Sequence, residues 1–316
     1  MTAIVNVNGR ISGEREAVIP VFDHGFLYGE GVYETLRTYN ERPFLLDRHL
    51  RRLRTSAEMI SLRVPLTDDQ FDARIAETER AAAAQLGGGL GEWYIRILLT
   101  RGVGELTYDP AACPTPSVVI IVKPFEAPPQ NAYEQGVNVT LVSIIRNHPE
   151  SVNPLIKSNN LLNNALAMQE AVRRGAFEGV MRNYRGELSE CTTANLFVVT
   201  NGQALTPPLE SGLLAGITRD FVFELGRAAV IPVREAVLRD EDLFDADEVF
   251  LTSTTRELLP ITRVDDRVIG NGQPGPITRR LLEAFRRRAD ALTKPVASQQ
   301  STVTSKLRAT VNGHHD

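Results

Sequence analysis

The sequence predicts a two-domain α/β protein, and three observations support this prediction. The chain has 316 residues, about twice the usual length of one domain. Short β-rich runs alternate with segments of helical period along its length. A proline-bearing, aperiodic segment, FEAPPQNAYEQG, interrupts this alternation at 125–136. We therefore expect a smaller domain over 1–124, a linker over 125–136 and a larger domain over 137–292.

The composition is that of an ordinary globular protein. Hydrophobic residues make up 42% of the chain and charged residues 23%, which suffices for a sizeable core. The net charge of −4 argues against nucleic-acid binding through bulk charge. Cys113 and Cys191 lie far apart, which fits a reducing compartment and predicts no metal site. Without a secretion signal or a long apolar run, we expect a soluble, cytoplasmic protein that does not enter membranes.

The first domain should begin with a hairpin, because Asn8-Gly9 is a favoured two-residue turn between β-rich runs. The remaining elements expected there, in order, are two strands around Asn40-Glu41, a helix capped by Asp47 that ends near Ile60, a helix opening at Thr67, and the strands EWYIRILLT and PSVVIIVKPF.

The second domain should begin with the strand VNVTLVSIIR and a helix. That helix is predicted because Leu161, Ala165, Met168 and Val172 recur on one helical face. The remaining elements expected there are the strand FEGVMRN, a hairpin turning at Asn201-Gly202, a helix over 218–227, the strand ADEVFLTSTT and a helix over 276–289. From 293 to 316 the apolar period is lost, which predicts a disordered tail.

One lysine, Lys157, stands among asparagines in NPLIKSNNLLNN, between a predicted strand and a predicted helix. Spacing alone favours a solvated lysine, although a lysine can also act as a base or form an imine with a carbonyl cofactor. Three other stretches favour a chemical role for Lys157. Glu190 leads into a strand, Gly216-Ile217-Thr218 opens a helix whose free N–H groups suit an anion, and Ser253-Thr254-Thr255 forms a hydroxyl-rich turn.

Five segments in this order resemble the class IV aminotransferases, the fold-type IV group of pyridoxal-phosphate enzymes. They are FDHGFLYGEGVYETLR, the segment around Lys157, GELSECTTANLF, LLAGITRD and ADEVFLTSTTREL. The resemblance covers about residues 3–290. It implies a D-amino-acid-aminotransferase-like fold with a barrel-like second sheet and pyridoxal 5'-phosphate in the interdomain cleft. It also implies a homodimer or a dimer-based hexamer, in which a loop like 102–108 reaches the neighbouring site.

The resemblance assigns roles to single residues. Lys157 matches the lysine that forms the Schiff base and then moves the proton, and Glu190 matches the carboxylate beside the pyridine nitrogen. Cofactor-phosphate contacts are matched by Arg52, by the backbone N–H groups of Ile217 and Thr218, and by the Thr254 hydroxyl, while Leu214 matches the leucine against the ring. A carboxylate at the ring nitrogen keeps it protonated, so the ring can take up electrons.

Six residues match positions that line the substrate pocket in the branched-chain aminotransferases. They are Tyr28, Tyr33, Arg37, Tyr94, Arg96 and Thr255. YIRILLTRGVG strongly resembles the archaeal-type members of that group. We therefore expect ping-pong transamination between branched-chain L-amino acids or glutamate and 2-oxoglutarate. Leu161 matches D-amino-acid aminotransferases instead, yet their arginine–histidine pair is absent from RGVGELTYDP. D-amino-acid or (R)-amine transamination is the alternative, and an aminodeoxychorismate lyase is a further one.

Overall fold

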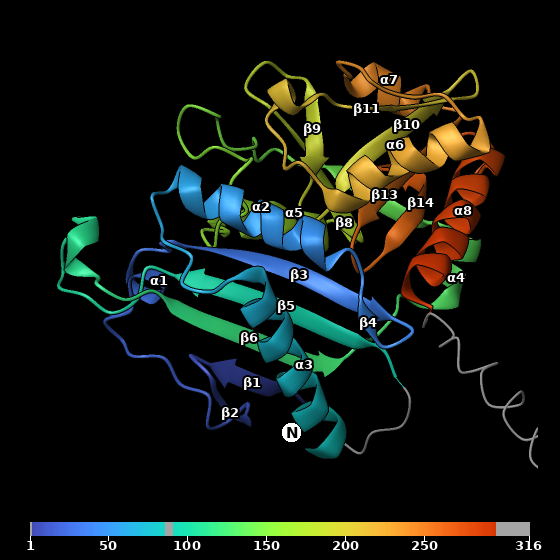
Figure 1. Ribbon diagram of the computed structural model, residues 1–316. Helices are drawn as coiled ribbons and strands as arrows, with labels where there is room; N and C mark the ends of the chain where they lie inside the picture. Colours follow the sequence, from blue (N-terminus) through green and yellow to red (C-terminus); the bar gives the residue numbers. More distant parts are fainter. Residues whose placement is uncertain (1, 86–90, 295–316) are drawn as a thin grey trace, which may run out of the picture.

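The computed structural model describes residues 2–85 and 91–294, which form two β-sheets with helices packed on each (Figure 1). The predicted tail lies outside the described residues, apart from Thr293 and Lys294. In the described ranges, no helix combines the length and the apolar character that crossing a bilayer requires.

The first sheet is antiparallel and has six strands in the order β2-β1-β6-β5-β3-β4. Its strands are β1 (Ile4–Val7), β2 (Arg10–Gly13), β3 (Gly31–Tyr39), β4 (Arg42–Pro43), β5 (Trp93–Thr100) and β6 (Ser117–Pro124). The predicted turns at Asn8-Gly9 and Asn40-Glu41 are confirmed, and these four residues have the positive φ that such turns need.

Two helices, α2 (Leu46–Met59) and α3 (Asp68–Gln85), cover one face of the first sheet. α3 begins as predicted, because Thr67 and Gln70 form a reciprocal cap at 2.8 and 3.2 Å. The predicted cap of α2 is wrong: the helix follows Leu45, which has a left-handed conformation, and Asp47 lies in its first turn. Two short helices, α1 (His24–Leu27) and the 3-10 turn Pro110–Ala112, lie in the loops at one end of the sheet.

The predicted linker is not entirely irregular. It contains the short helix α4 (Gln130–Glu134), whose Ala132 and Tyr133 pack against the core of the second sheet. This helix is too short to show a helical period in the sequence, so the segment was predicted only as a linker.

The second sheet has nine strands in the order β12-β11-β10-β13-β14-β7-β8-β9, with β15 paired to β14. They are β7 (Val137–Leu141), β8 (Glu178–Arg182), β9 (Leu188–Cys191), β10 (Asn195–Thr200), β11 (Gln203–Thr206), β12 (Val233–Glu235), β13 (Glu248–Ser253), β14 (Glu257–Val264) and β15 (Arg267–Val268). Residues 192–194 alone join β9 to β10, although these strands are far apart in the order. The sheet therefore curls back on itself, as the barrel-like expectation requires.

The helices of this half are α5 (Leu162–Arg173), α6 (Ile217–Ala229), α7 (Asp240–Phe244) and α8 (Pro276–Thr293). α6 and α8 lie together over the second sheet (Figure 1). The predicted helix is confirmed as α5, but its core face is formed by the buried Ala167 and Ala171, whereas Val172 of the predicted stripe is 65% exposed. Leu161, Ala165 and Met168 line a cavity instead, so their helical spacing marked a surface that faces the site.

The two halves meet through a long loop. The loop between β7 and α5 pairs with the free edge of β3, where Tyr33 N–H donates to Lys157 O and Asn159 N–H donates to Gly31 O, both at 2.9 Å. A Cβ on Gly31 would lie 2.5 Å from Asn159 Nδ2, so glycine permits this approach. This pairing carries Lys157 from the second half to the face of the first sheet.

Candidate active site

A cavity of about 470 Å³ lies where the two sheets face each other, a size that suits a cofactor or another small molecule. β3 and β5 contribute alternate side chains, Tyr33 and Thr35 from one and Tyr94 and Arg96 from the other. Val32 and Leu36, on either side of Tyr33 and Thr35, point into the core beneath α2, as the two-residue period of a strand requires. The wall opposite comes from the second sheet, the loop bearing Lys157 and the start of α6.

All but two of the site residues predicted from the sequence line this cavity. Those that line it are Lys157, Arg52, Glu190, Leu214, Ile217, Thr218, Thr254, Tyr33, Tyr94, Arg96 and Thr255. They come from segments distant in the sequence and from both sheets, so their convergence is a property of the fold.

Tyr28 and Arg37 were expected in the pocket, and the structure places both outside its lining. The Tyr28 ring packs against His24 and Tyr108, with centroids 4.9 and 5.0 Å away. The Arg37 guanidinium lies over two aromatic rings, those of Tyr39 and Phe125, at 4.0 and 3.8 Å. Their expected contacts with the substrate stay a prediction.

Lys157 presents its amine to the cavity from a fixed backbone. Its N–H donates to the Ser56 hydroxyl at 3.1 Å, and its Nζ lies 4.5 Å from the centroid of the Tyr33 ring. In the described part of the chain, no carboxylate forms an ion pair with this ammonium group. The amine is thus available to a ligand.

Glu190 is held by three donors, two of them on side chains that the sequence analysis did not single out. Its Oε1 accepts from Arg146 Nε at 2.7 Å, while its Oε2 accepts from Leu214 N–H at 3.1 Å and from Asn195 Nδ2 at 3.3 Å. Bonds of this kind fix the orientation of the carboxylate. Arg146 lies 44 residues before Glu190, and no spacing rule connects two such positions.

The start of α6 has the features of an anion site. Gly216 is the N-cap and no side chain caps the helix, so the N–H groups of Ile217 and Thr218 are available to a ligand. Nearby, the hydroxyls of Thr252 and Ser253 are buried and have no hydrogen-bond partner among the described residues. These unsatisfied polar groups and the helix end together fit a phosphate.

Arg52 stands beside this helix end in a fixed orientation. Its Nε and Nη2 donate to the Glu34 carboxylate at 2.7 and 2.8 Å, and its Nη1 donates to Ala215 O at 2.8 Å. Burial alone would raise the pKa of Glu34, but the Arg52 guanidinium and His49 lower that pKa to about 2. Burial in turn lowers the pKa of His49. An ionised Glu34 therefore orients Arg52 toward the anion site.

The turn after β13 is tied to the floor of the second sheet. Arg256 Nη1 donates to Glu178 Oε2 at 2.6 Å, and the same oxygen accepts from the Thr193 hydroxyl at 2.7 Å. The other oxygen accepts from the Thr192 hydroxyl. Glu178 is fully buried, while its three partners line the cavity. The sequence analysis missed this cluster because its members come from three separate segments.

The charges of the cavity wall favour anionic ligands. Three arginines are matched by carboxylates in the pairs Arg52–Glu34, Arg146–Glu190 and Arg256–Glu178. Within the described ranges, neither Lys157 nor Arg96 has such a partner, and the Arg96 guanidinium lies 4.2 Å from the centroid of the Tyr33 ring. The excess positive charge fits a ligand that bears phosphate and carboxylate groups.

Comparisons with known proteins agree with this geometry. The family model described as amino-transferase class IV matches residues 31–264. A protein of Methanocaldococcus jannaschii, provisionally named a branched-chain-amino-acid aminotransferase, is 39% identical over 282 residues, covering 89% of this chain and 95% of that protein. The D-alanine aminotransferase of Bacillus licheniformis is 31% identical over 278 residues, covering 88% and 94%.

A solved structure gives the same result. The branched-chain aminotransferase of the thermophilic archaeon Thermoproteus uzoniensis, solved with norvaline, matches with a TM-score of 0.84 at 33% identity, covering 92% of this chain and 96% of that one. The fold is thus that of an aminotransferase. The chain belongs to the class IV aminotransferase family.

Proposed function

We propose that this protein is a pyridoxal-phosphate-dependent aminotransferase that transfers nitrogen between branched-chain L-amino acids, glutamate and 2-oxoglutarate by a ping-pong mechanism. One observation carries the proposal: Lys157, Glu190 and the anion site at the start of α6 line the same cavity. The branched-chain names of the relatives from M. jannaschii and T. uzoniensis support the substrate class.

When bound, pyridoxal 5'-phosphate supplies a carbonyl for amines and a ring that accepts electrons. Glu190, fixed by Arg146, would contact the ring nitrogen, and Leu214 would pack on the ring. The residues that would hold the phosphate are Arg52, Ile217, Thr218 and Thr254. The unpartnered hydroxyls of Thr252 and Ser253 add further donors at this end of the cavity.

Lys157 would perform the proton transfer. Its Nζ projects over the Tyr33 ring and is anchored through its own backbone to Ser56 and Tyr33. As a neutral amine it would remove the proton from the substrate α-carbon and return it during the reverse half-reaction. The fixed backbone restricts that movement to the side chain.

Substrate carboxylates would meet the unpaired positive charge of Arg96, the Tyr94 hydroxyl and the turn at Thr254-Thr255. Arg96 would bind the second carboxylate of glutamate or 2-oxoglutarate, and the ring of Tyr33 would contact an apolar side chain. A site that accepts both substrate classes in turn meets the requirement of ping-pong transfer.

D-amino-acid transamination is the second candidate. Leu161 lines the cavity, and the D-alanine aminotransferase of B. licheniformis covers most of the chain. Absorption spectroscopy of the cofactor-loaded enzyme, with L-leucine, D-alanine and (R)-1-phenylethylamine offered separately, distinguishes the candidates. We expect rapid bleaching of the cofactor band with L-leucine alone. Bleaching with D-alanine or the (R)-amine alone would replace our proposal, and pyruvate release from aminodeoxychorismate would indicate the lyase.

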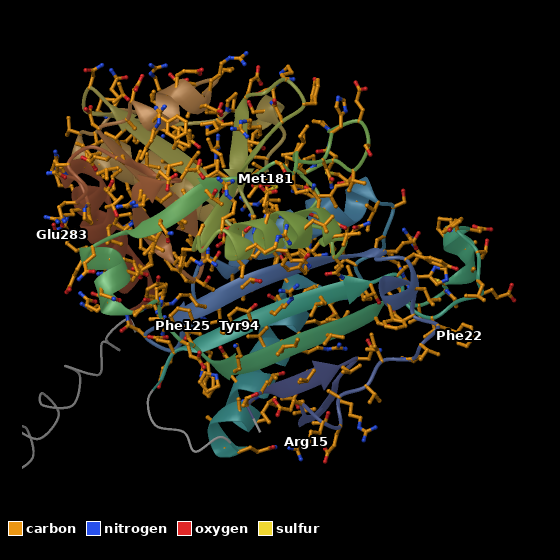
Figure 2. The ribbon with its side chains drawn as sticks, turned by 180° about the vertical axis from the view of Figure 1, so that it is seen from behind. Arg15, Phe22, Tyr94, Phe125, Met181 and Glu283 are labelled. Atoms are coloured by element: carbon orange, nitrogen blue, oxygen red, sulfur yellow. The ribbon has the colours of Figure 1, made fainter. Side chains whose placement is uncertain are left out.

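We also propose that residues 1–124 and 137–292 form two domains and that the chain assembles as a homodimer or a dimer-based hexamer. Two loops at the α1 end of the first sheet lie together, joined by a bridge between Asp23 and Val103. They expose the apolar side chains of Phe22, Phe26, Val103, Leu106 and Tyr108, and Figure 2 shows Phe22 at this outer end. Such a patch is typical of subunit interfaces. Analytical ultracentrifugation tests the assembly, and a monomer at all concentrations would contradict it.

A further inference from the structure

The turn between β13 and β14 ends on a buried carboxylate in an unusual conformation. Glu257 has a φ of +55°, in the left-handed region that favours glycine, and is 5% exposed. It directly follows Thr254, Thr255 and Arg256, which line the cavity. A glutamate held there against its backbone preference points to contacts of its side chain that fix the turn.

Those contacts come from the first sheet and from α8. Tyr39 at the end of β3 donates its hydroxyl to Glu257 Oε1 at 2.9 Å, and Arg37 Nη1 lies 3.7 Å from the same oxygen. From α8, Arg286 Nε donates to Glu257 Oε2 at 2.8 Å. Burial and the neighbouring Glu257 carboxylate raise the pKa of Tyr39 well above its usual value, so this hydroxyl stays a donor.

The same turn is held on its other side by the second sheet. The Arg256 side chain runs to the buried Glu178, and the Arg256 carbonyl accepts from the Tyr133 hydroxyl of α4 at 3.2 Å. Arg256 thus anchors the turn within the second half, whereas Glu257 connects it to both the first sheet and α8. Arg37, expected in the pocket, belongs to this anchor.

We propose that Glu257 is a positioning residue: its contacts with Tyr39, Arg37 and Arg286 hold the Thr254-Thr255 turn so that its N–H groups bind the substrate carboxylate. In the described structure these two N–H groups have no acceptor within the chain. Free amides on a fixed turn form an anion-binding concavity. This inference rests on the proposed function for the identity of the ligand.

The test uses the cofactor-loaded enzyme and the variant Glu257→Gln, which keeps the side-chain shape and removes the charge. Calorimetry measures the binding of 4-methylpentanoate, a leucine-shaped carboxylate that has no amine and cannot react. Steady-state kinetics with L-leucine supplies KM and kcat separately. Tyr39→Phe is a milder variant that removes one bond to the same carboxylate.

Glu248→Gln is the matched control. Glu248 is also a buried carboxylate and lies in β13, the strand before Glu257, but it binds the start of α8 through Ile277 N–H and Thr278 N–H at 2.9 and 2.7 Å and does not line the cavity. It reports the general effect of neutralising a buried acid in the strand paired with β14.

We expect Glu257→Gln to weaken 4-methylpentanoate binding and raise KM by about tenfold, the scale of one charge-assisted hydrogen bond, with kcat within about twofold. Tyr39→Phe should show a smaller effect of the same sign, and Glu248→Gln should lower Tm without changing either constant. Unchanged binding and KM in both Glu257→Gln and Tyr39→Phe would overturn the inference. A wild-type enzyme that binds the carboxylate but transfers no nitrogen would contradict the proposed function and leave the positioning role intact.

Discussion

Arg146 Nε lies 2.7 Å from Glu190 Oε1, and both side chains are buried, with 9% and 6% of their surface exposed. This ion pair connects the loop after β7 to the strand that carries the proposed cofactor-contacting carboxylate. The charge-assisted bond fixes the orientation of the Glu190 carboxylate. Any role of Glu190 toward a ring nitrogen therefore depends on Arg146.

Replacing Arg146 with methionine should lower the rate of the first half-reaction by about 10²-fold, as the loss of one preorganised electrostatic contact does in other enzymes. The cofactor should still bind, since Arg146 lies apart from the anion site. Stopped-flow absorption with L-leucine measures the rate. Arg182→Met removes a half-buried pair with Asp240 and is the control. Equal rates in the Arg146 variant and the wild type would exclude the role.

Glu34 should make the stability of the protein depend on acid pH. Its pKa is lowered from 4.5 to about 2, so its contribution is fully present above the unfolded value and is lost as the pH falls from 4.5 toward 2. The shift corresponds to about 3 kcal/mol. Urea unfolding at several acidic pH values should therefore show a shallower pH dependence for Glu34→Gln than for the wild type. Parallel curves would contradict the assigned ion pair.

Gly216→Ala should weaken cofactor binding. A Cβ at this position would lie 1.9 Å from Asn195 Oδ1, so Asn195 would be displaced from Glu190 and from Leu214 O, and the start of α6 would shift. We expect the apparent Kd for pyridoxal 5'-phosphate to rise by at least about tenfold, the scale of one lost hydrogen bond to a charged group. Equilibrium dialysis measures it. Wild-type affinity would show that this helix end does not bind the phosphate.

Arg96→Leu should discriminate between substrate classes. Arg96 has no carboxylate partner among the described residues and faces the cavity, so its loss should affect dicarboxylates most. We expect KM for 2-oxoglutarate to rise by about tenfold or more, while the leucine half-reaction changes by less than about threefold. An equal effect on both substrates would assign Arg96 a general structural role instead.

Local sequence signals predicted much of the fold. The turns at Asn8-Gly9, Asn40-Glu41 and Asn201-Gly202 were correct because their conformation depends on the residues themselves. The stripe on α5 shows where such signals fail. Leu161, Ala165 and Met168 have the period of a buried face, yet they line a cavity, and the core is formed by the small side chains of Ala167 and Ala171. Periodicity shows that a face is covered but not what covers it.

For the site, too, the sequence predicted some residues and missed others. Residues in distinctive motifs, such as Lys157 and Glu190, were predicted to share one pocket, and they do. Their supporting side chains were missed, because Arg146, Glu178 and Glu257 act through contacts between distant segments. Arg37 was expected in the pocket, but its side chain turns toward Tyr39 and Phe125.

The most direct test of the account is the transfer of ¹⁵N from L-leucine to 2-oxoglutarate by the wild type and by Lys157→Ala, with the fold of each checked by circular dichroism. We predict labelled glutamate from the wild type and a loss of at least about 10³-fold in the variant, since the base that moves the α-proton is gone. Transfer at the wild-type rate by Lys157→Ala would contradict the central claim that this amine carries out the reaction.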